Sequence, residues 1–310
     1  MRKIWKFLLH HLKSDFRTAD YTATAFLVIV AIIFNYRFDV EDRFLDQQEG
    51  FAKFFFYYLF YAIPYYLTLL FHTRQTLNNY WNKRTFWVRS QLALLVLSMD
   101  SSVPFLSDFI HSNFDDALIY WAYKVLINLI SIGTVFLPLF LFYFLYDRPT
   151  HTHVYGLNAR KFDVKPYFVM LLMMMPLLLS ASFHPSFIRQ YPMYKTSEAH
   201  LYLDVPEYIT ALIYEVAYGL DFVTVEFLFR GFMVIGLIHV VGRRAVLAMA
   251  VVYCFLHFGK PAGEAISSIF GGYILGVIAF ETRSIWGGII VHLGIAWMME
   301  IIGFVQRQIQ

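Results

Sequence analysis

Residues 223–232 read VTVEFLFRGF, and they place two opposite charges inside a long apolar run. Glu226 and Arg230 are four positions apart, so on a helix their side chains lie on one face. A charged side chain at the bilayer centre costs about 2.5–3.5 kcal/mol on insertion scales, and such residues persist where they are paired or functional. The stretch therefore predicts an ion pair within a membrane helix, with a functional site close to it.

The composition around this stretch is typical of a membrane protein. Of the 310 residues, 59% are hydrophobic and only 15% are charged, against roughly 25% in soluble domains. The mean hydropathy is +0.54, and several apolar runs reach the ~20 residues that cross a bilayer. We therefore predict an all-α fold, a polytopic transmembrane helix bundle of about eight spans.

Net charge narrows the choice of partners. The value of +3 is too small to indicate nucleic acid as a partner, so we expect the lipid bilayer and no nucleic acid. The one cysteine, Cys254, cannot form an internal disulfide, and it therefore says nothing about the redox compartment.

Loop charges predict the membrane topology. Residues 1–17 have the pattern of a basic amphipathic helix on the membrane surface, and the apolar run after them lacks a cleavage site, so we expect a retained first span. The loop after that span is mainly acidic, and the loops after the second and fourth spans are basic. The basic residues are Arg74, Lys83 and Arg84, then Arg148, Arg160, Lys161 and Lys165. Because Lys and Arg concentrate on the cytoplasmic side, we expect a cytoplasmic N-terminus.

A polar loop at residues 183–203 divides the chain. Residues 1–203 are predicted to form the surface helix and transmembrane spans without recognised motifs, and residues 204–310 a membrane core. In the core, Ser268, Gly272 and Gly276 recur every fourth residue. That pattern lets two membrane helices pack closely.

The first helical pattern of the core is too long for one straight span. It runs to about residue 241, or ~52 Å at 1.5 Å per residue, where a span needs ~30 Å. We expect a break at residues 219–221, with Asp221 capping the second helix. If the first half crosses the membrane fully, the Glu226 end faces the cytoplasm. If it is re-entrant, Arg243 and Arg244 are cytoplasmic and the site opens outward, as the positive-inside rule favours.

Two histidines stand in apolar runs downstream of the ion pair, His257 and His292. A single buried histidine is commonly a hydrogen-bonded structural residue. Two in separate spans favour a shared site, because imidazole serves as a general base, an oxyanion donor or a metal ligand. A zinc site needs more than two histidines and a carboxylate in suitable geometry, so we assign no metal ligands and leave the metal requirement and the cofactor open.

Three motifs resemble a known family when they are taken in order. EFLFRG (226–231), YCFLH (253–257) and TRSIWGGIIVH (282–292), with the small-residue span before the third, are similar to the CPBP family. That family comprises CAAX proteases and bacteriocin-processing enzymes, which are glutamate- and histidine-dependent intramembrane endopeptidases. The resemblance covers about residues 221–296, and it leaves the N-terminal spans without a counterpart.

The resemblance implies roles for five residues. Glu226 matches the second glutamate of the family's first motif, and Arg230 matches its arginine. Tyr253 stands at the aromatic position of the second motif. His257 and His292 match the histidines of the second and third motifs. The catalytic set that the resemblance implies is Glu226, His257 and His292, with Arg230 and Tyr253 in support; His257 would activate water and His292 would stabilise the oxyanion.

Two positions depart from the family pattern. Val225 stands where the first glutamate belongs, and Ala296 where an Asn or Asp belongs. Valine accepts no proton, and losing a general base costs roughly 10²–10⁴-fold in rate. Alanine donates no hydrogen bond, and an oxyanion donor lowers the barrier by ~2.7–4 kcal/mol. Two acids are considered as substitutes. Asp221 is one turn before Val225, and its alternative role is to cap a helix. Glu300 is one turn after Ala296, and its alternative position is at the membrane boundary.

Three functions remain open at this stage. The leading one is a CPBP-like intramembrane protease homologue, with intact or degenerate chemistry, that processes a membrane-bound peptide or protein. The alternative is a non-catalytic family member that acts as a membrane-partner-binding subunit or chaperone. A transporter is disfavoured because no internal repeat is visible. The resemblance implies an integral membrane protein of the bacterial inner membrane.

Overall fold

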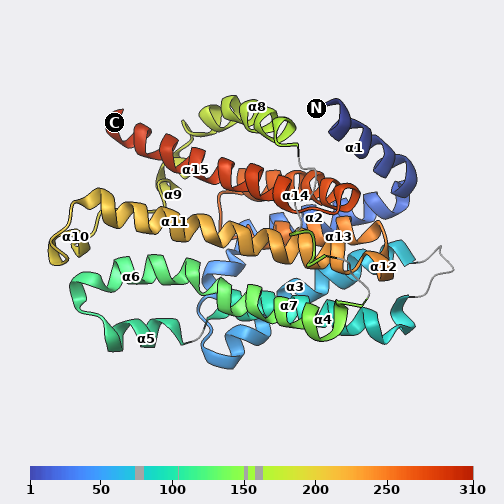
Figure 1. Ribbon diagram of the computed structural model, residues 1–310, viewed down its shortest axis with the longest axis horizontal. Coiled ribbons are helices and arrows are strands. Elements are labelled where there is room, and N and C mark those ends of the chain that lie inside the picture. The colour runs from blue at the N-terminus through green and yellow to red at the C-terminus, as the bar shows by residue number, and fades with distance from the viewer. Residues whose placement is uncertain (74–79, 104, 150–152, 158–162, 310) are drawn as a thin grey trace.

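The computed structural model describes residues 1–73, 80–103, 105–149, 153–157 and 163–309. Across these residues the secondary structure is helical, with no strand, and seven helices are long and apolar enough to cross a membrane. Two shorter apolar helices, α8 (Lys165–Ala181) and α13 (Arg244–Phe255), complete the bundle. The prediction of an all-α polytopic bundle is confirmed (Figure 1). Arg74, Arg160 and Lys161 lie outside the described residues.

The N-terminal part contains short irregular helices between its spans. Its elements are α1 (Arg2–Asp15), α2 (Thr18–Phe38), η1 (Glu41–Leu45), α3 (Gly50–Thr73), η2 (Tyr80–Asn82), α4 (Arg84–Ser102), α5 (Leu106–Asn113), α6 (Asp116–Leu129), η3 (Ile132–Phe136), α7 (Leu137–Phe142), η4 (Tyr143–Asp147), α8 and α9 (Pro185–Gln190). The remaining elements are α10 (Ala199–Tyr202), α11 (Glu207–Glu226), η5 (Phe227–Gly236), α12 (Ile238–Val241), α13, α14 (Ala262–Thr282) and α15 (Trp286–Ile309).

Helix α13 forms the centre of the bundle. All its residues from Ala245 to Phe255 are buried, and it packs against α3, α14 and η5. The small residues of α14 make the closest of these contacts. A Cβ atom on Gly272 would lie 2.9 Å from the Tyr253 ring, and one on Gly276 would lie 2.6 Å from Met249. The prediction of close packing along the small-residue stripe is confirmed.

The predicted break at residues 219–221 is wrong. Helix α11 continues through these residues to Glu226 and passes directly into η5, a π-helical segment. Gly219 does not end a helix; a Cβ atom there would lie 3.0 Å from Trp297 of α15, so the glycine permits close helix packing. Asp221 does not cap a helix either, because its carboxylate lies within α11 beside Thr224 and Ser131. The irregularity falls in η5, and π-helical turns are frequently found at functional sites.

Helix α1 is attached to the core at the turn before α13. Arg243 forms an ion pair with Glu281 of α14 at 2.5 Å. The same guanidinium donates to His11 Nδ1 at 3.3 Å and to His10 Nε2 at 3.1 Å. Burial lowers the pKa of His11 to about 4, so its ring is neutral and able to accept. The N-terminal helix and Arg243 therefore lie at the same end of the bundle. Helices α1 and α12 are on the right of Figure 1.

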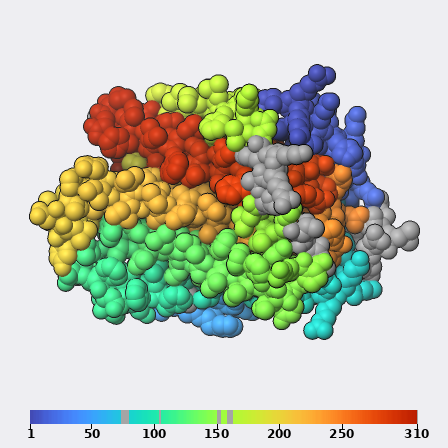
Figure 2. Space-filling view, viewed as in Figure 1, coloured from blue at the N-terminus to red at the C-terminus, as the bar shows by residue number. Residues whose placement is uncertain are grey.

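Apolar side chains cover the outside of the bundle. Helix α8 packs against α15, and the two lie along one edge of the face in Figure 2. After Lys165 at its start, the large side chains that α8 exposes are apolar: Phe168, Val169, Leu172, Met173, Met175, Leu177 and Leu179. Such a surface fits a hydrocarbon environment, in which apolar side chains need no cover. The chain is an integral membrane protein.

Candidate functional site

The five residues singled out in the sequence come from four elements and meet in the core. Glu226 is the last residue of α11, and Arg230 lies in η5. Tyr253 is in the last turn of α13, His257 follows that helix, and His292 is in the second turn of α15.

Glu226 and Arg230 form a buried ion pair. Both side chains are fully buried, and Arg230 Nη1 lies 2.9 Å from Glu226 Oε1. The Arg230 guanidinium also lies over the Tyr253 ring, with its central carbon 4.2 Å from the ring centroid. An aromatic face attracts a cation most strongly where water is excluded. The Tyr253 ring therefore packs against the Arg230 guanidinium and stabilises its charge.

His292 connects the ion pair to Tyr253. Its Nδ1 lies 3.0 Å from Glu226 Oε1, and its Nε2 lies 2.8 Å from the Tyr253 hydroxyl. A carboxylate only accepts hydrogen bonds, so Nδ1 carries the proton that is donated to Glu226. In the neutral ring Nε2 is then an acceptor, and the Tyr253 hydroxyl donates to it. The result is a chain of hydrogen bonds from Tyr253 through His292 to Glu226.

His257 is held in a different way. Its Nδ1 donates to the backbone carbonyl of Tyr253 at 2.8 Å. Because Nδ1 carries the proton, Nε2 of the neutral ring keeps a free lone pair. The Tyr253 ring lies between the two imidazoles, with centroids 4.5 Å from His257 and 5.7 Å from His292. Both histidines are partly exposed, whereas the ion pair behind them is not.

Gly288 is a site residue that the sequence argument missed. A Cβ atom at this position would lie 2.0 Å from Glu226 Oε2, so only glycine leaves room for the carboxylate. Gly288 is one helical turn before His292, on the same face of α15. The glycine pair after Trp286 was the available signal. Phe222 covers the other side of His292, with ring centroids 4.5 Å apart.

The two departures from the family pattern have different surroundings. Val225 is half-buried and packs against the main hydrophobic core. Ala296 is only 1% exposed and packs in a cluster that contains Tyr218 and Ala217 of α11. A larger polar side chain at 296 would have to enter this packed space. The space that an Asn or Asp would fill is thus occupied by apolar packing.

The two acids considered as substitutes have structural partners. The Glu300 carboxylate accepts from the backbone N–H of Met193 at 2.8 and 3.0 Å, and it is buried, not at a solvated boundary. Asp221 is half-buried and lies beside Ser131 and Thr224, with the charge of Asp100 nearby. Glu300 therefore anchors the loop before α10, and Asp221 belongs to a polar contact with η3 and α4.

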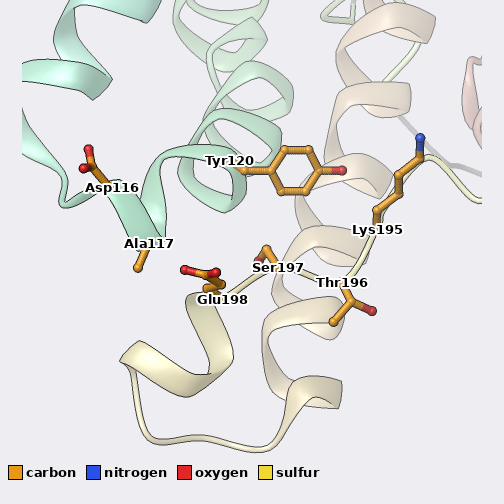
Figure 3. Close-up of a pocket in the computed structure, with 7 residues that line it drawn as sticks. All are labelled: Asp116, Ala117, Tyr120, Lys195, Thr196, Ser197 and Glu198. Carbon is orange, nitrogen blue, oxygen red and sulfur yellow. The ribbon is translucent and has the colours of Figure 1, made fainter.

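One surface pocket lies away from these residues. It has a volume of about 390 Å³ and is formed at the start of α6 and in the loop before α10 (Figure 3). None of the five residues lines it. Within the described part of the chain, no group of three or more His, Cys, Asp or Glu side chains is arranged to hold a metal ion.

Comparison with known proteins supports the resemblance over the core. Residues 204–298 match the family model described as Rce1-like, type II CAAX prenyl endopeptidase Rce1-like. Searches of curated proteins and of solved structures each found no match. The matched range includes all five residues, both departures and Gly288. Over residues 204–298 this integral membrane protein is therefore similar to the Rce1-like CAAX prenyl endopeptidases, which is consistent with the resemblance to the CPBP family.

Proposed function

We propose that this protein is a CPBP-like intramembrane protease homologue that processes a membrane-bound peptide or protein. The observation that carries the proposal is the arrangement of His257. Its Nδ1 is occupied by the Tyr253 carbonyl, so Nε2 is the free basic nitrogen. It stands beside Tyr253, in front of the buried Glu226–Arg230 pair, where a general base can act on a bound water.

In the proposed reaction, His257 Nε2 removes the proton from the attacking water. The developing oxyanion needs a hydrogen-bond donor. The one N–H of neutral His292 is at Nδ1 and is hydrogen-bonded to Glu226. The ring therefore has no second N–H to donate to the oxyanion. The Tyr253 hydroxyl therefore supplies the donor, by turning its O–H from His292 Nε2 to the oxyanion. Glu226 holds the His292 ring in place by accepting from its Nδ1. The His257 imidazolium then gives its proton to the leaving amine, which completes the addition of water across the peptide bond.

The family's first glutamate is absent from this site. With valine at 225, His257 acts without the carboxylate partner that the resemblance implies, and we expect slow hydrolysis. We also propose that residues 204–310 form the core that contains the site. Residues 1–203 form the membrane scaffold around it.

One observation favours a second function. Ala296 is packed against Tyr218 and Ala217 of α11, which closes the space of the missing Asn or Asp. A site that has lost both a base and a donor suits a non-catalytic subunit or chaperone that binds a membrane partner. Such a protein holds its partner in stoichiometric amounts and does not shorten it.

The His257→Ala variant separates the two functions. We expect it to lose cleavage of the native substrate by ~10²-fold or more while it remains folded, because His257 is partly exposed and carries no ion pair. Wild type and variant are purified in gentle detergent from the native host, and co-purifying proteins are sized by mass spectrometry. His239→Ala on α12 is the matched control, since His239 is exposed and is not one of the five site residues.

A protein recovered full-length with the variant but shortened with wild type identifies the substrate. Equal retention of an intact stoichiometric partner by wild type, His257→Ala and His239→Ala would instead establish the binding function.

We also propose the orientation and location of the protein. The basic helix α1 and Arg243 lie at one end, and the acidic residues of the loop after α2 follow one span later. The positive-inside rule then makes the N-terminus and Arg243 cytoplasmic, in a bacterial inner membrane. The turn after His257, which contacts the acidic loop, faces outward.

Cysteine labelling tests this orientation. In a Cys254→Ala background, single cysteines replace Lys3 in α1 and Glu49 in the acidic loop, both of which are exposed. A membrane-impermeant maleimide should label the Glu49→Cys protein in intact cells with a permeabilised outer membrane. It should label the Lys3→Cys protein only after the inner membrane is broken. The reverse pattern would invert the proposed orientation.

A further inference from the structure

The turn that follows His257 is bonded to a part of the chain that lacks recognised motifs. The Asn35 side-chain amide donates to the Phe258 carbonyl at 3.1 Å, and the Tyr36 hydroxyl donates to the Lys260 carbonyl at 2.7 Å. Both donors are in the last turn of α2. Carbonyls beyond the end of a helix have no intrahelical partner. Two side chains of α2 therefore satisfy backbone groups on either side of Gly259.

Glu41 of η1 completes this contact. Its backbone N–H donates to Asn35 Oδ1 at 3.3 Å, so the Asn35 amide is bound at both ends. The Glu41 carboxyl lies against Gly259 and interacts with its backbone N–H. A Cβ atom on Gly259 would lie 3.2 Å from the carboxyl carbon of Glu41 and 3.3 and 3.4 Å from its oxygens. Glycine at 259 is thus what admits the carboxyl.

We propose that Asn35, Tyr36 and Glu41, here named the α2–η1 clamp, position His257, and that ionisation of Glu41 loosens the clamp. The imidazole is fixed by one bond, from Nδ1 to the Tyr253 carbonyl, so the backbone turn decides where Nε2 lies. A displacement of about 1 Å costs roughly 10²-fold in rate. The catalytic consequence rests on the proposed function, whereas the clamp itself does not.

The charge around Glu41 gives the clamp its pH dependence. Burial, with Asp46 and Asp42 nearby, raises the pKa of Glu41 from its ordinary 4.5 to about 8. The titratable groups that face Glu41 are Asp42 and Asp46 of its own loop, Lys260 of the turn, Tyr36 of α2, and Tyr57 and Tyr61 of α3. Lys260 is the cation among them, and it opposes the shift.

The sign of the dependence follows from proton linkage. The closed clamp binds the Glu41 proton more tightly than the open turn does, because the pKa is about 8 when closed and near 4.5 when open. The clamp is therefore fully stable below pH ~4.5. The equilibrium constant between the closed and the open clamp falls by up to about tenfold per pH unit as the pH rises toward 8. Above that pH it no longer changes.

Hydrogen–deuterium exchange of the peptide that contains residues 257–260 tests the clamp without any substrate. The purified full chain is compared at pH 6, 7 and 8, with intrinsic exchange rates divided out. We expect wild-type protection to fall with rising pH, by up to about tenfold per unit. Glu41→Gln keeps an acceptor for Gly259 but cannot ionise, so its protection should not change with pH. Glu41→Ala should be weakly protected throughout.

The matched control is Glu49→Gln, which removes an equal charge from an exposed position in the same loop. It should behave as wild type. Protection in wild type that is independent of pH, a Glu41→Gln profile equal to that of wild type, or full protection in Glu41→Ala would each overturn the proposal.

The catalytic consequence has its own measurement. With the substrate identified through the His257→Ala comparison, Glu41→Ala should lower kcat by about 10-fold or more and leave KM within twofold. The reason is that Glu41 positions the base and does not touch substrate. Glu41→Gln should restore kcat and flatten its decline between pH 6 and 8. If exchange follows the expected pattern but no cleavage is found in wild type, the clamp holds and the protease proposal fails.

Discussion

The Glu226→Ala variant is expected to lose about 3–5 kcal/mol of unfolding free energy. Arg230 is fully buried, and Glu226 is its ion-pair partner at 2.9 Å. Removing the carboxylate leaves a guanidinium without a counter-charge in an apolar core. The Tyr253 face and the polar groups nearby compensate only a part of that cost. Reversible unfolding in mixed micelles, followed by circular dichroism, measures the loss.

A double variant provides the control for this prediction. In Glu226→Met, Arg230→Met both charges are replaced by apolar side chains of similar length. Replacing a buried pair by packed apolar groups is commonly neutral or stabilising, so the double variant should be close to wild type in stability. A Glu226→Ala protein as stable as wild type would show that Arg230 has another counter-charge or is neutral.

This result also decides how catalysis should be tested. A Glu226 variant that loses activity has two explanations, because the same side chain holds the ion pair and accepts from His292 Nδ1. His257 has no such double role. Its replacement removes the free Nε2 and leaves the buried charges paired.

Val225→Glu is expected to increase cleavage by about 10²–10⁴-fold if the site is a slow protease. The substitution restores the carboxylate that the family pattern places before Glu226. Position 225 is half-buried, so the new side chain avoids the cost of full burial. The rate is measured on the substrate identified through His257→Ala, in reconstituted vesicles and at equal protein amounts.

Val223→Glu is the matched control. It is also half-buried and lies two residues earlier on α11, so its side chain points to another face of the helix. It should leave the rate unchanged. If Val225→Glu folds and still cleaves nothing that the native host supplies, the apolar packing at Ala296 is enough to prevent catalysis. The partner-binding function is then the better account.

Several features were predictable because they depend on local composition and periodicity. The apolar runs predicted the membrane helices, and the i,i+4 spacing predicted the ion pair on one helix face. The small residues of α14 predicted its close contact with α13. The motifs at 226–231, 253–257 and 282–292 identified the residues that meet in the core, because their order and spacing carry the family resemblance. Each of these signals lies within a few helical turns of sequence.

The sequence argument failed where long-range packing decides the local structure. A glycine followed by a possible cap predicted a helix break at 219–221, but Gly219 admits Trp297 of α15 and the helix continues. The irregular segment is η5, which the pattern of apolar residues does not mark. Gly288 was missed because its purpose, room for the Glu226 carboxylate, depends on a residue far away in the chain.

By itself the sequence determined that this chain is a membrane helix bundle, that Glu226 and Arg230 pair, and that a valine and an alanine replace two expected polar residues. Only the tertiary structure decided that His257 keeps a free Nε2 and that both ring nitrogens of His292 are hydrogen-bonded. His292 meets Glu226 across 66 positions and Tyr253 across 39. Phe258 meets Asn35 across 223. The reason is physical: a proton's location and a turn's position depend on partners that only the packing of separate helices brings within 3 Å.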